Sequence, residues 1–107
     1  MKILTRHEEH VLLTILHLGD NAYLVTIREH LKELTGKDQS FGTLYVLLRR
    51  LEKAGYINHR VGEATAKRGG KAIKYYTVTE YGIETLTEIQ KVQVSMWLNF
   101  SEFAYKK

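Results

Sequence analysis

Residues 40–79 constrain the fold most, because they predict a helix followed directly by a β-hairpin. A buried helical stripe with i, i+3, i+4, i+7 spacing is formed by Leu44, Leu47, Leu48 and Leu51. Ser40 is a typical N-cap for this helix, and Gly55 is a typical stop. Strand-like segments at residues 56–61 and 73–78 follow, joined by a polar loop. The sequence therefore predicts a mixed fold, mainly α with a small β-hairpin (α+β).

The positive charge of the chain is concentrated in the same stretch. Residues 41–78 carry eight lysine or arginine side chains against two glutamates, an excess of six, whereas the whole chain has a net charge of +4. Residues 1–40 and residues 79–107 each have a net charge of −1. This asymmetry favours a localised anion-binding surface over a generally basic protein. A solvated, lysine-rich surface is the alternative interpretation.

A first helix is predicted to begin at a capping box. The Thr5 hydroxyl and the Glu8 carboxylate are spaced so that each accepts a hydrogen bond from the backbone N–H of the other. Apolar residues then cover most of the helix circumference as far as Leu18. We therefore expect this helix to be enclosed, either in the centre of the domain or by a partner subunit.

A second capping box, Thr26 with Glu29, predicts another helix that ends at Gly36. Its buried face is expected to contain Ile27, Leu31 and Leu34. A short turn connects this helix to the basic helix after Ser40. Two helices joined in this way form a helix-turn-helix.

The final segment, residues 80–107, predicts a long helix with an apolar stripe that continues for about six turns. Because residues 1–79 already form a complete small domain, nothing in the chain remains to cover this stripe. Burying such side chains contributes roughly 1.5–3 kcal/mol each, and a symmetric dimer is the simplest way to bury them. The expected dimer contacts are Ile83, Leu86, Ile89, Met96, Phe100 and Phe103, together with Val11 and Ile15 of the first helix.

The basic helix presents a candidate nucleic-acid surface opposite its leucines. Helices that enter a DNA groove contact bases with residues near their N-terminus, so Gln39, Thr43 and Val46 are candidates for base contacts. Ser40 and Tyr45 are candidates for phosphate contacts. The basic side chains of the helix and the hairpin loop complete this surface: Arg49, Arg50, Lys53, Lys67, Arg68 and Lys71. In the alternative interpretation, the helix arginines only solubilise its surface and pair with nearby acids.

The chain lacks the residues that several other classes of function require. The chain has no cysteine, which excludes disulfides, thiolate metal sites and cysteine nucleophiles. A strand follows the glycine loop at residues 67–71, whereas a nucleotide-binding P-loop leads into a helix. The string from His7 to His10 lacks the i, i+4 histidines of a zinc protease. We therefore expect no enzymatic activity, no metal and no cofactor.

The N-terminus contains neither a long apolar run nor a signal cleavage site. No apolar run in the chain has the length of a transmembrane helix. We therefore expect a cytoplasmic protein that does not associate with membranes.

Met96, Trp97 and Phe100 form an aromatic-rich stripe at helical spacing near the C-terminus. Packing within the core or the dimer is one interpretation of this stripe. The other is a ligand pocket between subunits, in which Trp97 stacks on a small planar effector.

Residues 41–57, FGTLYVLLRRLEKAGYI, resemble the recognition-helix signature of the PadR family of transcriptional regulators. The segments RGGK (68–71) and KYYTVTEYG (74–82) resemble the wing of that family and the start of its C-terminal helix. The resemblance extends over about residues 5–95, with both motifs in the expected order. It implies a winged-helix dimer of the short subfamily, which has a single C-terminal helix. Such a dimer represses transcription at a palindromic operator and is released by a small molecule or another signal.

The resemblance also implies roles for individual residues. DNA contacts are implied for Ser40, Thr43, Tyr45, Arg49 and Arg50, and the wing residues Lys67, Arg68 and Lys71 are implied to lie on the minor-groove side. Our main hypothesis is a homodimeric, sequence-specific repressor that binds double-stranded DNA. The alternative is a winged-helix protein-interaction module whose basic face binds an acidic protein.

Overall fold

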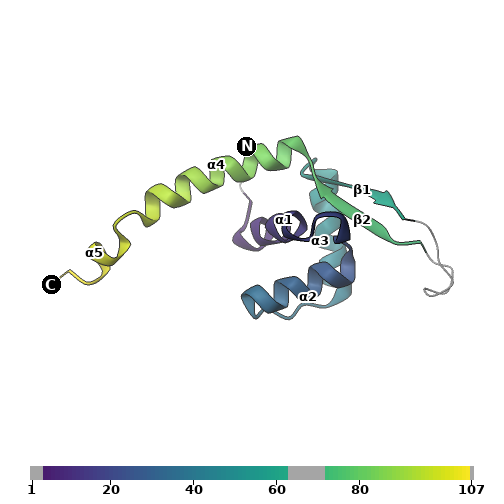
Figure 1. Ribbon diagram of the computed structural model, residues 1–107, viewed down its shortest axis with the longest axis horizontal. Helices are drawn as coiled ribbons and strands as arrows, with labels where there is room; N and C mark the ends of the chain where they lie inside the picture. The colour runs from purple at the N-terminus through teal and green to yellow at the C-terminus, as the bar shows by residue number, and fades with distance from the viewer. Residues whose placement is uncertain (1–3, 63–71, 107) are drawn as a thin grey trace.

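The computed structural model describes residues 4–62 and 72–106, and Figure 1 shows a helical body with a protruding hairpin and a long C-terminal helix. The predicted fold class is confirmed, since the described chain is mainly helical with one antiparallel pair of strands. No helix in the described ranges is long and apolar enough to cross a membrane. The elements in chain order are α1 (Arg6–Leu18), the 3-10 helix η1 (Gly19–Asn21), α2 (Leu24–Thr35), α3 (Phe41–Lys53), β1 (Ile57–Val61), β2 (Lys74–Val78), α4 (Glu80–Trp97) and α5 (Phe100–Ala104).

The caps predicted for α1 and α3 are confirmed. The Thr5 hydroxyl accepts a hydrogen bond from the Glu8 N–H (3.0 Å), and the Glu8 carboxylate accepts one from the Thr5 N–H (2.8 Å). At α3, the Ser40 hydroxyl accepts a hydrogen bond from the Thr43 N–H (3.1 Å). These bonds satisfy N–H groups that the first turn of a helix leaves unpaired.

The cap predicted for the second helix was wrong, because Thr26 lies inside the first turn of α2 and Tyr23 is the N-cap. The Thr26 hydroxyl accepts a hydrogen bond from the Tyr23 N–H (3.0 Å) and donates one to the Asn21 carbonyl (2.6 Å). Just before this start, the Tyr76 N–H donates to the Ala22 carbonyl (2.8 Å). Pairing with β2 therefore holds the chain extended up to Tyr23, and the helix begins immediately afterwards.

One hydrophobic core lies where α1, α2, α3 and the hairpin meet. The predicted leucine stripe of α3 is buried there, as are Val11, Leu12, Ile15, Ile27, Leu31, Ile57 and Tyr76. The prediction that Leu34 is buried was wrong, since its side chain is 58% exposed at the end of α2. Leu16 is 44% exposed, so the protomer alone covers α1 incompletely.

The hairpin forms close to the predicted positions. β1 and β2 pair antiparallel, with Ile57 opposite Val78 and Val61 opposite Lys74. The Gly62 N–H extends the pairing by donating to the Ile73 carbonyl (2.7 Å). The intervening loop, including the predicted contacts Lys67, Arg68 and Lys71, lies outside the described residues.

α4 begins against the hairpin and then extends beyond the core. Near its start, Tyr81 stacks on Tyr56 with ring centroids 5.0 Å apart, and Leu86 and Ile89 pack against the core. From Val92 onward nearly every side chain is exposed. Figure 1 shows the helix running away from the helical body toward the C-terminus, which makes the molecule elongated, with extents of 63 × 28 × 21 Å.

The long C-terminal helix predicted from periodicity is confirmed as α4, but it does not continue to the end of the chain. α4 ends at Trp97, Asn99 adopts a left-handed conformation (φ 61°), and the short helix α5 follows. Asparagine tolerates this conformation better than other non-glycine residues because its short polar side chain can bond locally. The apolar spacing continues across the break and therefore did not reveal it.

Candidate nucleic-acid interface

α3 exposes its basic side because its leucines face the core. Val46, Arg49, Arg50 and Lys53 are all exposed. Within residues 4–62 and 72–106, no ion pair neutralises any of these three cations. Glu52, the acidic residue of α3, instead lies 2.6 Å from the His59 ring nitrogen. The exposed face of α3 therefore retains its positive charge for an external anion.

The N-terminal end of α3 adds two exposed hydroxyl groups to this face. Ser40 Oγ donates a hydrogen bond to Thr43 Oγ1 (2.8 Å) while it accepts one from the Thr43 N–H. The Thr43 hydroxyl, which accepts from Ser40, therefore keeps its own hydrogen available for an acceptor. Hydroxyl groups can bond either to phosphate or to base edges.

The turn before α3 is held by two residues that were not predicted from the sequence. Arg28 of α2 donates from Nε to the Gln39 carbonyl (2.7 Å) and from Nη2 to Asp38 Oδ1 (2.9 Å), and its guanidinium lies 4.6 Å from the Phe41 ring centroid. His7 of α1 donates from Nε2 to Gln39 Oε1 (2.9 Å). These contacts fix the start of α3 relative to α1 and α2. No local sequence signal indicates them, because the partners are 10–32 residues apart.

An open groove of about 850 Å³ lies beside this end of α3, and its lining includes His7, Gln39, Thr43, Val46 and Arg50. Burial lowers the pKa of His7 below its ordinary value of 6.5, and this effect outweighs the hydrogen bond to Gln39, which raises it. The imidazole is therefore neutral near pH 7. The Gln39 oxygen is occupied by His7, so its NH₂ group is the part available to an external acceptor.

A second groove, of about 600 Å³, separates α3 from β2 and is lined by Val46, Arg49, Arg50, Glu52, Lys53 and Lys74. Lys74 Nζ donates to the Tyr45 hydroxyl (3.2 Å), which connects the hairpin to α3. Arg60 lies over the Tyr75 ring at 4.5 Å. Arg60 and Lys74 are among the eight basic residues of the stretch 41–78, but they were not predicted as contact residues.

The predicted contact residues of the helix therefore share one surface. Gln39, Ser40, Thr43, Tyr45, Val46, Arg49, Arg50 and Lys53 lie along the exposed side of α3 or at its N-terminus. Burial raises the pKa of Tyr76, beneath this helix, to about 12, so its phenol remains neutral. Contact of these residues with DNA remains a prediction.

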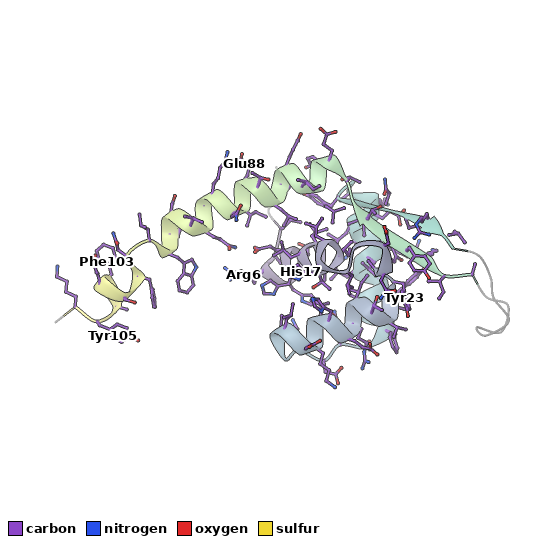
Figure 2. All side chains as sticks on the ribbon, viewed as in Figure 1. Arg6, His17, Tyr23, Glu88, Phe103 and Tyr105 are labelled. Carbon is purple, nitrogen blue, oxygen red and sulfur yellow. The ribbon has the colours of Figure 1, made fainter. Side chains whose placement is uncertain are left out.

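The residues predicted for dimerisation fall into two groups. Val11 and Ile15 lie inside the protomer core, and Leu86 is buried while Ile89 is partly buried against that core. The exposed members are Ile83, Met96, Phe100 and Phe103. Figure 2 shows Phe103 of α5 and Tyr105, which directly follows this helix, far from the helical body. Of the predicted residues, only this exposed group is available to an interface built on α4 and α5.

The aromatic stripe proposed as a ligand pocket lies in the same exposed region. Trp97 and Phe100 are in contact across the break between α4 and α5, with ring centroids 4.9 Å apart. Met96 and Trp97 are 77% and 57% exposed. The protomer by itself therefore does not enclose this cluster.

Comparisons with known proteins agree on one family. The family described as "Transcriptional regulator PadR-like family" matches residues 12–88. Among solved structures, a PadR-like transcriptional regulator from Bacillus cereus is 22% identical, with 94% of this chain and 93% of that chain covered and a TM-score of 0.76. A PadR-like transcription factor from Bacteroides fragilis is 28% identical, with 89% and 87% covered and a TM-score of 0.68. No curated protein matches the chain.

Proposed function

This chain belongs to the PadR-like family of transcriptional regulators, which are DNA-binding proteins, and we propose that it is a homodimeric, sequence-specific repressor. The observation that carries the proposal is the exposed side of α3. Three cations without ion pairs among the described residues lie there beside the hydroxyl groups of Ser40 and Thr43. Neutralising phosphates with such cations supplies much of the affinity of a protein for duplex DNA.

In the proposed complex, α3 lies in the major groove. Thr43 and Val46 face base edges, where a hydroxyl can bond to a base and an apolar side chain can contact a thymine methyl group. Arg49, Arg50 and Lys53 contact phosphates or guanine edges further along the helix. Gln39, also predicted to contact bases, offers its NH₂ group to an acceptor on the DNA, because its oxygen accepts a hydrogen bond from His7.

The hairpin is the second DNA-binding element of the proposal. Lys74 and Arg60 extend the basic surface from α3 onto the strands. The loop residues Lys67, Arg68 and Lys71 would contact phosphates on the minor-groove side. Tyr45 connects the two elements through its contact with Lys74, so we assign it to positioning as well as to phosphate contact.

Dimerisation through α4 and α5 would present two copies of α3 to one operator. A two-fold symmetric dimer binds half-sites whose centres are about 34–36 Å apart, one turn of DNA. We further propose that a signal relieves repression. The Trp97 and Phe100 cluster supports a small planar effector, because closing a dimer over these rings would create an aromatic site between subunits.

The proposal is tested by selecting bound duplexes from a random pool and then measuring affinity for the selected sequence by fluorescence anisotropy. We expect a palindromic motif. Arg49→Ala should weaken binding by about 1–3 kcal/mol and, if Arg49 contacts a phosphate, reduce the salt slope by about 1. Lys91→Ala is the control, because Lys91 is an exposed cation on α4 that pairs with Glu88.

Equal affinities for the two variants would contradict the assignment of Arg49 to the DNA surface. If the purified protein does not bind duplex DNA but does bind an acidic protein partner, the result would instead favour the protein-interaction module.

A further inference from the structure

Two histidines from different helices face each other on the surface of the helical body. His17 lies in the last turn of α1, and His30 lies in the second half of α2. His17 Nδ1 and His30 Nε2 are 3.3 Å apart, and the two rings are perpendicular with centroids 5.4 Å apart. Figure 2 shows His17 on the side of α1 where α2 lies. Neither histidine belongs to the α3 surface.

The separation of the two nitrogens suits a shared metal ion. Zinc–imidazole bonds are about 2.0–2.1 Å long, so nitrogens 3.3 Å apart subtend about 107° at a common ion, close to a tetrahedral angle. Around such an ion the ring centroids would be about 5.2 Å apart, a few tenths of an ångström less than in this structure. Small side-chain rotations are therefore enough to direct both nitrogens at one point.

The backbone beneath the two rings is held by the core. On α1, Ile15 is 2% exposed, and on α2, Ile27 and Leu31 are 0% and 3% exposed. Side chains carried by packed helices keep their positions better than side chains on loops. The pair is solvent-accessible, since the contact between the rings is itself exposed. Water can therefore reach the coordination positions that the protein does not fill.

We propose that His17 and His30 form a two-histidine site for a divalent transition-metal ion of the class that prefers imidazole, such as Zn²⁺. Within residues 4–62 and 72–106, no group of three or more histidine, aspartate or glutamate side chains is placed to hold a metal. Water therefore completes the coordination, as expected for a site that is open to exchange.

Binding requires a change of tautomer but no change in total charge of the imidazoles. As the rings stand, one facing nitrogen carries the hydrogen and the other accepts it. Metal binding requires a lone pair on both facing nitrogens, so the hydrogen moves to the other nitrogen of the donor ring. The ion then replaces a hydrogen bond between α1 and α2 with two coordination bonds, and it should stabilise the folded state by linkage.

The test is calorimetric titration of ZnCl₂ into protein without a histidine tag. We expect one Zn²⁺ per protomer, together with changes in the ¹⁵N imidazole signals of His17 Nδ1 and His30 Nε2. His17→Gln and His30→Gln should each weaken binding at least about tenfold, since even loss of an outer-shell contact to a metal ligand costs 10–100-fold. His10→Gln, the same change two turns earlier on α1, should leave binding unchanged.

Circular dichroism of each variant separates loss of the site from loss of the fold. The proposal is overturned if wild-type protein binds no Zn²⁺ at millimolar concentration. It is also overturned if His17→Gln and His30→Gln fold correctly and bind Zn²⁺ as the wild type does. In either case the two rings share only a hydrogen bond.

Discussion

At Gly82 the first turn of α4 lies so close to the hairpin that a methyl group does not fit. A Cβ atom there would meet the Tyr56 carbonyl oxygen and would lie 2.6 Å from Val78 Cγ1. The Tyr56 carbonyl belongs to the backbone, which cannot move aside as the end of a flexible side chain can. This single residue therefore determines how near α4 approaches the winged-helix body.

We expect Gly82→Ala to lower the free energy of unfolding by about 1–3 kcal/mol, the usual cost of inserting atoms into a packed site. Gly42→Ala is the matched control, because nothing lies within 4 Å of a Cβ atom at that helical position. The control should stabilise the protein by about 0.5–1 kcal/mol, since alanine loses less entropy than glycine in a helix. Urea unfolding measures both changes. Similar effects from the two substitutions would show that α4 does not need this close approach.

His7 should make stability depend on pH. Its pKa in the folded protein is lowered below 6.5 by burial, so the unfolded chain takes up the proton first as the pH falls. The contribution of neutral His7 to the free energy of unfolding is therefore fully present above pH 6.5. It is lost as the pH falls through the pKa of His7 in the folded protein. Urea unfolding at pH 7.5 and pH 5.5 measures the loss of unfolding free energy between the two pH values, and this loss should be smaller in His7→Gln than in the wild type. An identical loss in wild type and His7→Gln would contradict the prediction.

At the scale of elements, the direction of α4 depends on a contact between opposite ends of the chain. Gln93 Nε2 donates to both carboxylate oxygens of Glu9, at 2.8 and 3.1 Å. Glu9 is only 8% exposed, and its ion pair with Arg6 spans 3.9 Å. The Gln93 amide is thus the closer partner of a nearly buried carboxylate.

We expect Gln93→Ala to destabilise the protein by about 1–3 kcal/mol, because a buried acceptor loses its donor. Gln90→Ala, one turn earlier on an exposed position of α4, should change stability by less than about 0.5 kcal/mol. Urea unfolding at one protein concentration compares the two variants. If both are equally stable, the contact does not orient α4.

At the scale of the whole molecule, the elongated shape leaves the far end of the chain without a core. Met96, Phe103 and Tyr105 are 77%, 72% and 79% exposed. Exposed apolar side chains gathered in this way mark an interaction surface more often than a free surface. A second copy of the chain would cover them and bring two copies of α3 into one molecule.

Light scattering after gel filtration should therefore give twice the protomer mass of 12.4 kDa for the wild type. Met96→Asp should weaken the dimer at least about tenfold, because burying an unpaired carboxylate is costly. Ser95→Asp adds the same charge to the neighbouring position as the control. A wild-type monomer at tens of micromolar would contradict dimerisation through this region.

The sequence by itself determined the local features of this protein. Hydrogen bonds and periodicities within a few residues determine the capping at Thr5 and Ser40, the leucine stripe of α3 and the positions of both strands. The exposed basic side of α3 follows as well, because burial of the leucines leaves Arg49 and Arg50 on the opposite side.

Only the tertiary structure decided features that depend on partners distant in sequence. The start of α2 is set by the pairing of Ala22 with Tyr76, and the turn before α3 is set by Arg28 and His7. The break at Asn99 and the facing rings of His17 and His30 likewise have no periodic signature. Periodicity reports which face of one helix is apolar, whereas the contacts between elements depend on their relative placement in space.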